Sequence, residues 1–154
     1  MGNYPTTGKL AYKLGEKLGE GGCGTVFKAT RLLDSKPCAI KILSHPVTQI
    51  LDEKRLQEYD LEKTLSSTLS HPWVVDSFDH YLDDKNLSCL VFDYYKEGDF
   101  AQYLRSHERK AFTEQEIVRI LANMAITIHF INTRGIFHRD LKPENFLITR
   151  GNGN

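Results

Sequence analysis

The stretch His138–Asn145 constrains the fold of this chain most strongly, because it places a run of mostly polar residues between two apolar segments. A helical pattern that ends near Gly135 precedes it, and a short strand-like run follows. A polar loop held between two buried elements is where catalytic groups usually lie. Phosphoryl transfer uses a carboxylate that accepts the hydroxyl proton, a cation that meets the phosphate and an amide that binds metal. Residues of these three types are present at short spacing: Asp140, Lys142 and Asn145.

The stretch reads HRDLKPEN and resembles the catalytic loop of protein kinases, H-R-D-L-x-x-x-N, at every fixed position. The residues Lys142-Pro143-Glu144 that fill it resemble those of serine/threonine kinases rather than tyrosine kinases. The resemblance implies that Asp140 orients and deprotonates the substrate hydroxyl and that Lys142 steadies the γ-phosphate of ATP. It also implies that Asn145 binds a Mg²⁺ ion.

A glycine-rich stretch, Gly19–Val26, follows an alternating run that predicts a strand. Its GxGxxG spacing is compatible with a dinucleotide fingerprint, a P-loop or a kinase glycine loop. A P-loop requires lysine after the last glycine, where this chain has Thr25. A dinucleotide fingerprint requires a helix directly after the glycines, whereas the next two segments, Thr25–Ala29 and Cys38–Leu43, are typical of strands joined by a turn. The order of strand, turn and strand favours the kinase loop.

Lys41 is the single charged residue inside the second of these strands, in the form Ala39-Ile40-Lys41, and it resembles the phosphate-binding lysine of kinases. A glutamate of the following helix pairs with that lysine in the family. We expect this to be Glu62, with Glu58 one helical turn earlier as the alternative. The resemblance further implies nucleotide contacts from the glycines and from the walls of the adenine pocket: Gly19, Gly21, Gly22, Gly24, Val26 and Ala39.

The segment after Phe92 changes from an apolar strand to a short polar run with a glycine, which is typical of a linker. By resemblance to the kinase hinge, Phe92 guards the inner pocket, and Asp93 and Tyr95 offer backbone groups to adenine. Asp99 stands where a carboxylate often meets the ribose, although N-capping of the next helix explains it equally well. Leu147 would contact adenine from the opposite side.

These segments predict an α+β protein kinase fold, with a five-stranded antiparallel lobe that carries one helix, a hinge and the first helices of an α-rich lobe. Residues 73–78 and 87–92 are the expected fourth and fifth strands. Residues 100–107 form an expected short helix, and a capping box at Thr113 opens a longer one that Gly135 ends. We assign residues 1–11 to an N-terminal extension, 12–95 to the first lobe and hinge, and 96–154 to part of the second lobe.

Composition excludes several other classes. The chain has 154 residues, and its 20 basic and 20 acidic residues give no net charge, so nucleic acid is not an expected partner. Three cysteines without metal spacing suit a reducing, cytoplasmic compartment. No apolar run is long enough to span a membrane. Residues 1–6 match the N-myristoylation pattern at Gly2, but we expect an unmodified N-terminus.

The function that these resemblances imply is transfer of the γ-phosphoryl group of ATP, with Mg²⁺, to a serine or threonine hydroxyl of a protein substrate. The 154 residues contain no D-F-G triplet, which supplies a magnesium carboxylate in kinases. We therefore expect these residues alone, as a truncated kinase domain, to be inactive. The alternative is a non-catalytic nucleotide-binding or interaction module.

Overall fold

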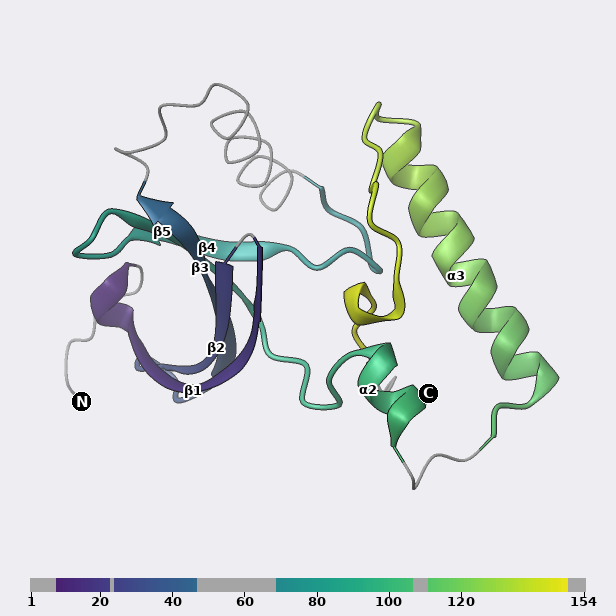
Figure 1. The fold of residues 1–154 in the computed structure, drawn as a ribbon, viewed down its shortest axis with the longest axis horizontal. Coiled ribbons are helices and arrows are strands. Elements are labelled where there is room, and N and C mark those ends of the chain that lie inside the picture. The colour runs from purple at the N-terminus through teal and green to yellow at the C-terminus, as the bar shows by residue number, and fades with distance from the viewer. Residues whose placement is uncertain (1–7, 23, 47–68, 107–110, 150–154) are drawn as a thin grey trace. The chain divides into compact units, whose positions relative to one another are not determined.

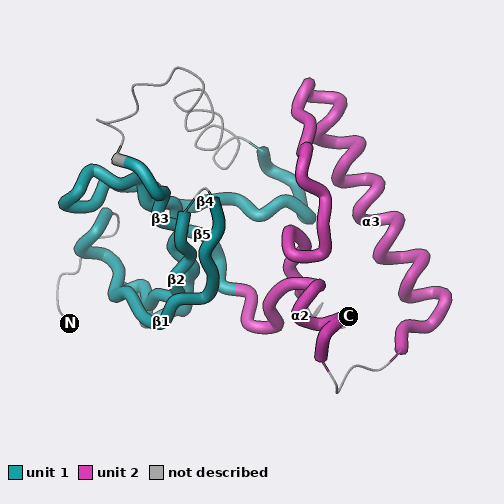
Figure 2. The backbone as a smooth tube through the Cα atoms, viewed as in Figure 1, with its two compact units in different colours: residues 1–94 teal, residues 95–154 magenta. Residues whose placement is uncertain are grey.

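The computed structural model describes residues 8–22, 24–46, 69–106 and 111–149. The chain divides into two compact units, residues 1–94 and residues 95–154, which Figure 2 distinguishes by colour. The helix expected between Pro46 and Ser70, with Glu58 and Glu62, falls on residues 47–68, which lie outside the described residues.

The first unit contains a five-stranded antiparallel sheet in the order β1-β2-β3-β5-β4 (Figure 1). This confirms the expected strand number and direction. The strand bounds are β1 Tyr12–Gly21, β2 Gly24–Arg31, β3 Pro37–Pro46, β4 Ser77–Leu82 and β5 Leu87–Asp93. The turn before β3 forms because the carboxylate of Asp34 accepts a hydrogen bond from the backbone N–H of Lys36, while Ser35 takes a left-handed φ of 58°.

The fourth strand was wrongly placed in the sequence analysis. It begins at Ser77, and the bulky residues Trp73 to Val75 precede it in a turn and bend. Val74 donates its N–H to the carbonyl of His71, and Trp73 donates its N–H to the His71 ring, so local bonds hold this segment out of the sheet. The indole of Trp73 is half-exposed. Its high strand propensity is therefore overridden by the turn that follows Pro72.

The main cluster of buried residues in the first unit lies on one face of the sheet. Cross-strand partners share a face, so Ala29, Cys38 and Asp93 lie on the same side, and alternation adds further residues of β3 and β5 to it. The buried cluster consists of Ala11, Tyr12, Ala29, Cys38, Ile40, Cys89 and Val91, with Ile42 and Tyr81 packed against it. The opposite face carries Val26, Ala39, Lys41 and Phe92.

The short 3-10 helix η1, Lys9–Ala11, closes the core at one end. Ala11 is fully buried, and its carbonyl accepts a hydrogen bond of 2.8 Å from Leu32. The carboxylate of Asp79 accepts bonds from the Gly8 N–H (3.0 Å) and the Tyr12 hydroxyl (2.8 Å). Burial, followed by this carboxylate, raises the pKa of Tyr12 above its usual range. Residues directly before β1 are thus part of the folded lobe.

The second unit contains the helices α2, Phe100–Arg105, and α3, Glu114–Asn132, and the 3-10 turn η3, Pro143–Asn145. The predicted capping box is confirmed, since Thr113 and Glu116 each bond to the backbone N–H of the other. After the helix ends at Asn132, Gly135 takes a φ of 76° and Ile136 donates to the carbonyl of Ile131. Glycine is favoured there because side chains rarely adopt that backbone conformation.

In the described part of the chain, no helix is long and apolar enough to cross a membrane.

Candidate nucleotide-binding and phosphoryl-transfer site

The glycine stretch forms the connection of the β1–β2 hairpin. Gly19 pairs with Val26, and Gly21 pairs with Gly24, so the strands run to the tip of the hairpin. Gly22 lies at this tip, next to Cys23, which is outside the described residues. The sequence predicted a loop between strands, and the structure makes most of that loop part of the strands themselves.

The four glycines of this hairpin differ in what requires them. A Cβ atom on Gly24 would overlap the carbonyl oxygen of Ile42 and lie 3.0 Å from the Cα of Leu43, so packing of β2 on β3 requires glycine there. A Cβ on Gly19, Gly21 or Gly22 would meet no atom of the described residues within 4 Å. Packing does not explain these three glycines. Their open backbone is compatible with the close approach of a phosphate, which stays a prediction.

Lys41 lies in the middle of the sheet, opposite Val26 on β2 and Leu90 on β5. On β3 it is two residues from Ala39, which pairs with Phe92. Because paired residues and residues two apart share a face, the structure brings Val26, Ala39, Lys41 and Phe92 together on one face. This face is the one opposite the buried core. Asp93 alternates to the core face, which is compatible with a backbone role for it and not with a side-chain role on the same face.

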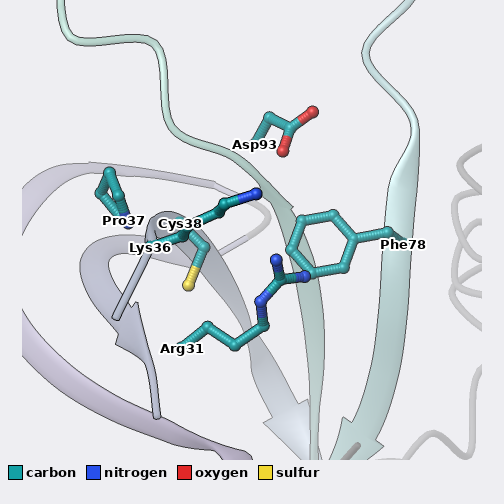
Figure 3. A pocket seen from close by; sticks show the side chains of 6 residues that line it. All are labelled: Arg31, Lys36, Pro37, Cys38, Phe78 and Asp93. Atoms are coloured by element: carbon teal, nitrogen blue, oxygen red, sulfur yellow. The ribbon is translucent and has the colours of Figure 1, made fainter. Parts of the chain in front are cut away.

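A small cavity of about 40 Å³ lies on the core side of the sheet (Figure 3). It is lined by Arg31, Lys36, Pro37, Cys38, Phe78 and Asp93. The Arg31 guanidinium bonds to Asp34 at 2.9 Å and 2.5 Å and lies over the Phe78 ring, 5.5 Å from its centroid. This cavity contains none of the residues on the Lys41 face and is too small for a nucleotide.

In the second unit, two of the three predicted catalytic-loop residues, Lys142 and Asn145, contact the carboxylate of the third, Asp140. The Nζ atom of Lys142 lies 2.8 Å from Oδ2 of Asp140. The Nδ2 group of Asn145 donates to the same Oδ2 at 3.1 Å and to the Asp140 carbonyl at 2.7 Å. The hydrogen bond from Lys142, followed by that from Asn145, holds the pKa of Asp140 below its usual range. Asp140 is therefore ionised at neutral pH, and its carboxylate can accept a hydrogen bond from a hydroxyl group.

The backbone around Asp140 is shaped by its two preceding residues. Arg139 has a φ of 60°, a conformation uncommon for residues other than glycine. The Asp140 N–H points to the His138 ring nitrogen Nδ1 at 3.4 Å. His138 thus contacts the backbone of the loop, which is a structural role.

The loop is fixed to the start of α2 by backbone bonds. Phe100 donates to the Phe146 carbonyl at 2.8 Å, and Ile148 donates to the Gly98 carbonyl at 3.0 Å. Between these bonds, Asp99 and Leu147 form an isolated antiparallel bridge. The Asp99 side chain accepts a hydrogen bond of 2.7 Å from the Gln102 N–H and caps α2. The capping interpretation of Asp99 is therefore confirmed, and a contact with ribose stays a prediction.

The residues around Asp140 suit a magnesium ion that also binds phosphates. Both side-chain hydrogen bonds of Asn145 to Asp140 use Nδ2, so the amide oxygen Oδ1 is the atom that suits a cation. Mg²⁺ is usually held by one or two protein oxygens together with substrate phosphates. Within residues 8–22, 24–46, 69–106 and 111–149, no group of three His, Cys, Asp or Glu side chains could hold a metal alone. The oxygen atoms of Asp140 and Asn145 therefore fit a magnesium site that is completed by the phosphates of a bound nucleotide.

Comparisons with known proteins agree with this geometry. The family model described as Protein kinase domain matches residues 12–154. Human 3-phosphoinositide-dependent protein kinase 1 is 34% identical over 137 residues, which cover 89% of this chain and 24% of that protein. Mouse serine/threonine-protein kinase PLK2 is 33% identical over 144 residues, which cover 94% of this chain and 20% of that protein. A serine/threonine-protein kinase of Arabidopsis thaliana is 31% identical over 137 residues, 89% of this chain and 23% of that protein.

The chain thus spans between a fifth and a quarter of the length of these relatives. The match nevertheless covers both the glycine hairpin with Lys41 and the loop around Asp140. On the geometry and the comparisons together, the chain belongs to the protein kinase family.

Proposed function

We propose that this chain supplies the nucleotide-binding lobe and the catalytic loop of a serine/threonine protein kinase, which transfers the γ-phosphoryl group of ATP to a protein hydroxyl. The observation that carries the proposal is the convergence of Lys142 and Asn145 on Oδ2 of Asp140. One carboxylate, one cation and one amide within hydrogen-bond distance are the groups that phosphoryl transfer requires of the protein at the acceptor side.

Asp140 receives the acceptor hydroxyl in this proposal. Its carboxylate, ionised at neutral pH, orients the hydroxyl oxygen and takes its proton as the new oxygen–phosphorus bond forms and the bond from the γ-phosphorus to the leaving ADP oxygen breaks. Lys142 places its charge beside Asp140 and steadies the transferred phosphoryl group. Asn145 offers Oδ1 to a magnesium ion. The ATP–magnesium pair supplies the activated phosphoanhydride and neutralises the charge that develops on its oxygens.

The face of the first unit that carries Lys41 binds the nucleotide in this proposal. The open backbones of Gly19, Gly21 and Gly22 approach the phosphates, and Gly24 keeps the hairpin packed on β3. Lys41, paired with Glu62, binds the α- and β-phosphates. The remaining contacts are made by Val26, Ala39 and Phe92 with adenine, by the backbones of Asp93 and Tyr95, and by Asp99 and Leu147.

The test is transfer of label from γ-labelled ATP to serine, threonine and tyrosine acceptor peptides, measured on a complete kinase domain that contains this segment. We expect transfer to serine or threonine, and a loss of about 10²-fold or more with Asp140→Asn, since general-base catalysis contributes that much. Glu144→Gln removes an exposed charge from the same loop and should retain activity. Undiminished turnover of the Asp140→Asn variant would exclude the proposed role.

A further inference from the structure

Strand β1 contains a bulge opposite Lys28. Leu14 pairs with Ala29 and Lys17 pairs with Phe27, so two residues of β1, Gly15 and Glu16, face the single residue Lys28 on β2. The strands approach closely at this point, because a Cβ on Gly15 would lie 3.1 Å from the Lys28 carbonyl oxygen. A bulge redirects one side chain of its strand, and bulges are frequent beside active sites.

Glu16, one of the two residues in the bulge, contacts Lys28. Its Oε1 atom lies 3.5 Å from the Nζ atom of Lys28. The same Nζ atom lies over the ring of Tyr94, 4.9 Å from the ring centroid. Lys28 therefore connects three places: the bulge in β1, its own strand β2, and the residue directly after β5. Its side chain is 40% exposed, so each contact is of modest strength.

Lys28 lies on the face of the sheet that carries Lys41. It pairs with Ala39, which pairs in turn with Phe92, and it is two residues from Val26. Tyr94 stands between Asp93 and Tyr95, whose backbone groups we assign to adenine. The contact from Lys28 to Tyr94 thus joins the glycine hairpin to the backbone segment that contacts adenine.

We propose that Lys28 is a positioning residue for nucleotide binding, which holds Tyr94 against the glycine hairpin with the help of Glu16. This inference rests on the proposed function. The physical effect is preorganisation. A backbone that is already held beside the hairpin loses less conformational freedom when the nucleotide binds, so affinity rises without a direct contact between Lys28 and the nucleotide.

The experiment compares ATP affinity by calorimetry, with magnesium, for the 154-residue chain and its variants. Lys28→Met keeps the aliphatic stem and removes the charge. We expect a dissociation constant about two- to fivefold higher, the change that loss of an exposed cation–π contact produces. The melting temperature without nucleotide should stay unchanged. Lys13→Met removes an exposed lysine from β1 and serves as the matched control, with unchanged affinity.

A conservative variant and a double variant distinguish the positioning role of Lys28 from a general effect of its charge on ATP affinity. Lys28→Arg should retain parental affinity, because a guanidinium stacks on an aromatic ring as well as an ammonium does. Tyr94→Phe should retain it, and Tyr94→Leu should lose as much as Lys28→Met. The double variant Lys28→Met/Tyr94→Leu should bind no more weakly than either single variant, because both remove one interaction.

The outcomes distinguish failure of the positioning role of Lys28 from failure of the proposed kinase function. If the parent binds ATP and Lys28→Met binds equally well, the positioning role is wrong and the proposed function stands. If the parent does not bind ATP, the proposed function fails. Should Lys28→Met fail to fold, Tyr94→Leu with parental affinity would overturn the positioning role.

Discussion

The Nδ2 group of Asn145 donates to both the carbonyl oxygen and the carboxylate oxygen Oδ2 of Asp140, at 2.7 Å and 3.1 Å. These two bonds close the 3-10 turn η3 onto the residue that we assign as the proton acceptor. Both bonds use the amide nitrogen. The amide oxygen of Asn145, which is the kind of atom that a magnesium ion requires, takes no part in either bond. One side chain therefore fixes both the position of the carboxylate and the orientation of its own amide oxygen, the atom that we propose binds magnesium.

The ionisation of Asp140 provides a first prediction. Lys142→Met removes the largest cause of its lowered pKa, so the pKa should rise toward its ordinary value, and Asn145→Ala should raise it less. NMR titration of the aspartate carboxyl carbons measures both. Lys96→Met, at an exposed lysine of the same unit, is the control and should leave the pKa of Asp140 in place. An unchanged titration in Lys142→Met would contradict the assigned ion pair.

Substitutions at the hairpin glycines should have two different effects, one on stability and one on ATP binding. Gly24→Ala forces a Cβ against the Ile42 carbonyl and should destabilise the lobe by about 1–3 kcal/mol, the usual cost of overpacking. Gly21→Ala places its Cβ in open space and should leave stability unchanged while it weakens ATP binding. Urea unfolding and calorimetry measure the two effects. Equal destabilisation by both changes would show that packing, not ligand approach, explains Gly21.

Acid should weaken the turn between β2 and β3. The hydrogen bond from Arg31 lowers the pKa of Asp34 to about 2 from its ordinary value of 3.8. Because the folded-state pKa is depressed, the stability that this pair contributes is present above the ordinary pKa and is lost as pH falls toward 2. Asp34→Asn should therefore flatten the decline in urea midpoint over that range. Asp76→Asn, at an exposed carboxylate, should leave that decline as it is in the parent. If the urea midpoint of Asp34→Asn fell with pH as steeply as that of the parent, the Arg31–Asp34 pair would not be its cause.

The long helix α3 predicts association of the chain. Among the described residues of this helix only Ile131 is buried, and the apolar side chains of Ile117, Leu121 and Ile126 are 45%, 59% and 56% exposed. Exposed apolar surface of this kind promotes self-association. Light scattering at micromolar concentration should show particles larger than a monomer, and Leu121→Glu should reduce them. Leu33→Glu, at an exposed leucine of the first unit, should not. A monomeric parent would contradict this expectation.

Features that depend on neighbouring residues were predictable from the sequence. The capping box of α3 needs only Thr113 and Glu116, three positions apart, and the turn before β3 needs only Asp34 and its neighbours. The catalytic loop is equally local, since Asp140, Lys142 and Asn145 meet within one short turn. For these, the identity and spacing of the residues determine the contact.

Features that depend on strand register were not predictable. The sequence treats all four glycines of the hairpin alike, whereas the distant Ile42 sets Gly24 apart from the others. The bulge that contains Glu16 opposite Lys28 exists only once β1 and β2 are paired, so no periodicity in the sequence reveals it. Strand β4 was misplaced for a related reason. Its polar residue Asp79 is accommodated by bonds to Gly8 and Tyr12, far away in the sequence.

Lys41 tests the central claim most directly. If the face that carries it binds ATP, Lys41→Met should weaken binding about 10- to 100-fold, because a charge-assisted hydrogen bond contributes about 1.5–3 kcal/mol. Lys36→Met, at an exposed lysine of the turn before β3, is the matched control and should bind as the parent does. Calorimetric titration with ATP and magnesium gives all three affinities. Parental affinity in Lys36→Met with a marked loss in Lys41→Met is the predicted result, and equal affinity in the parent and Lys41→Met would contradict the account.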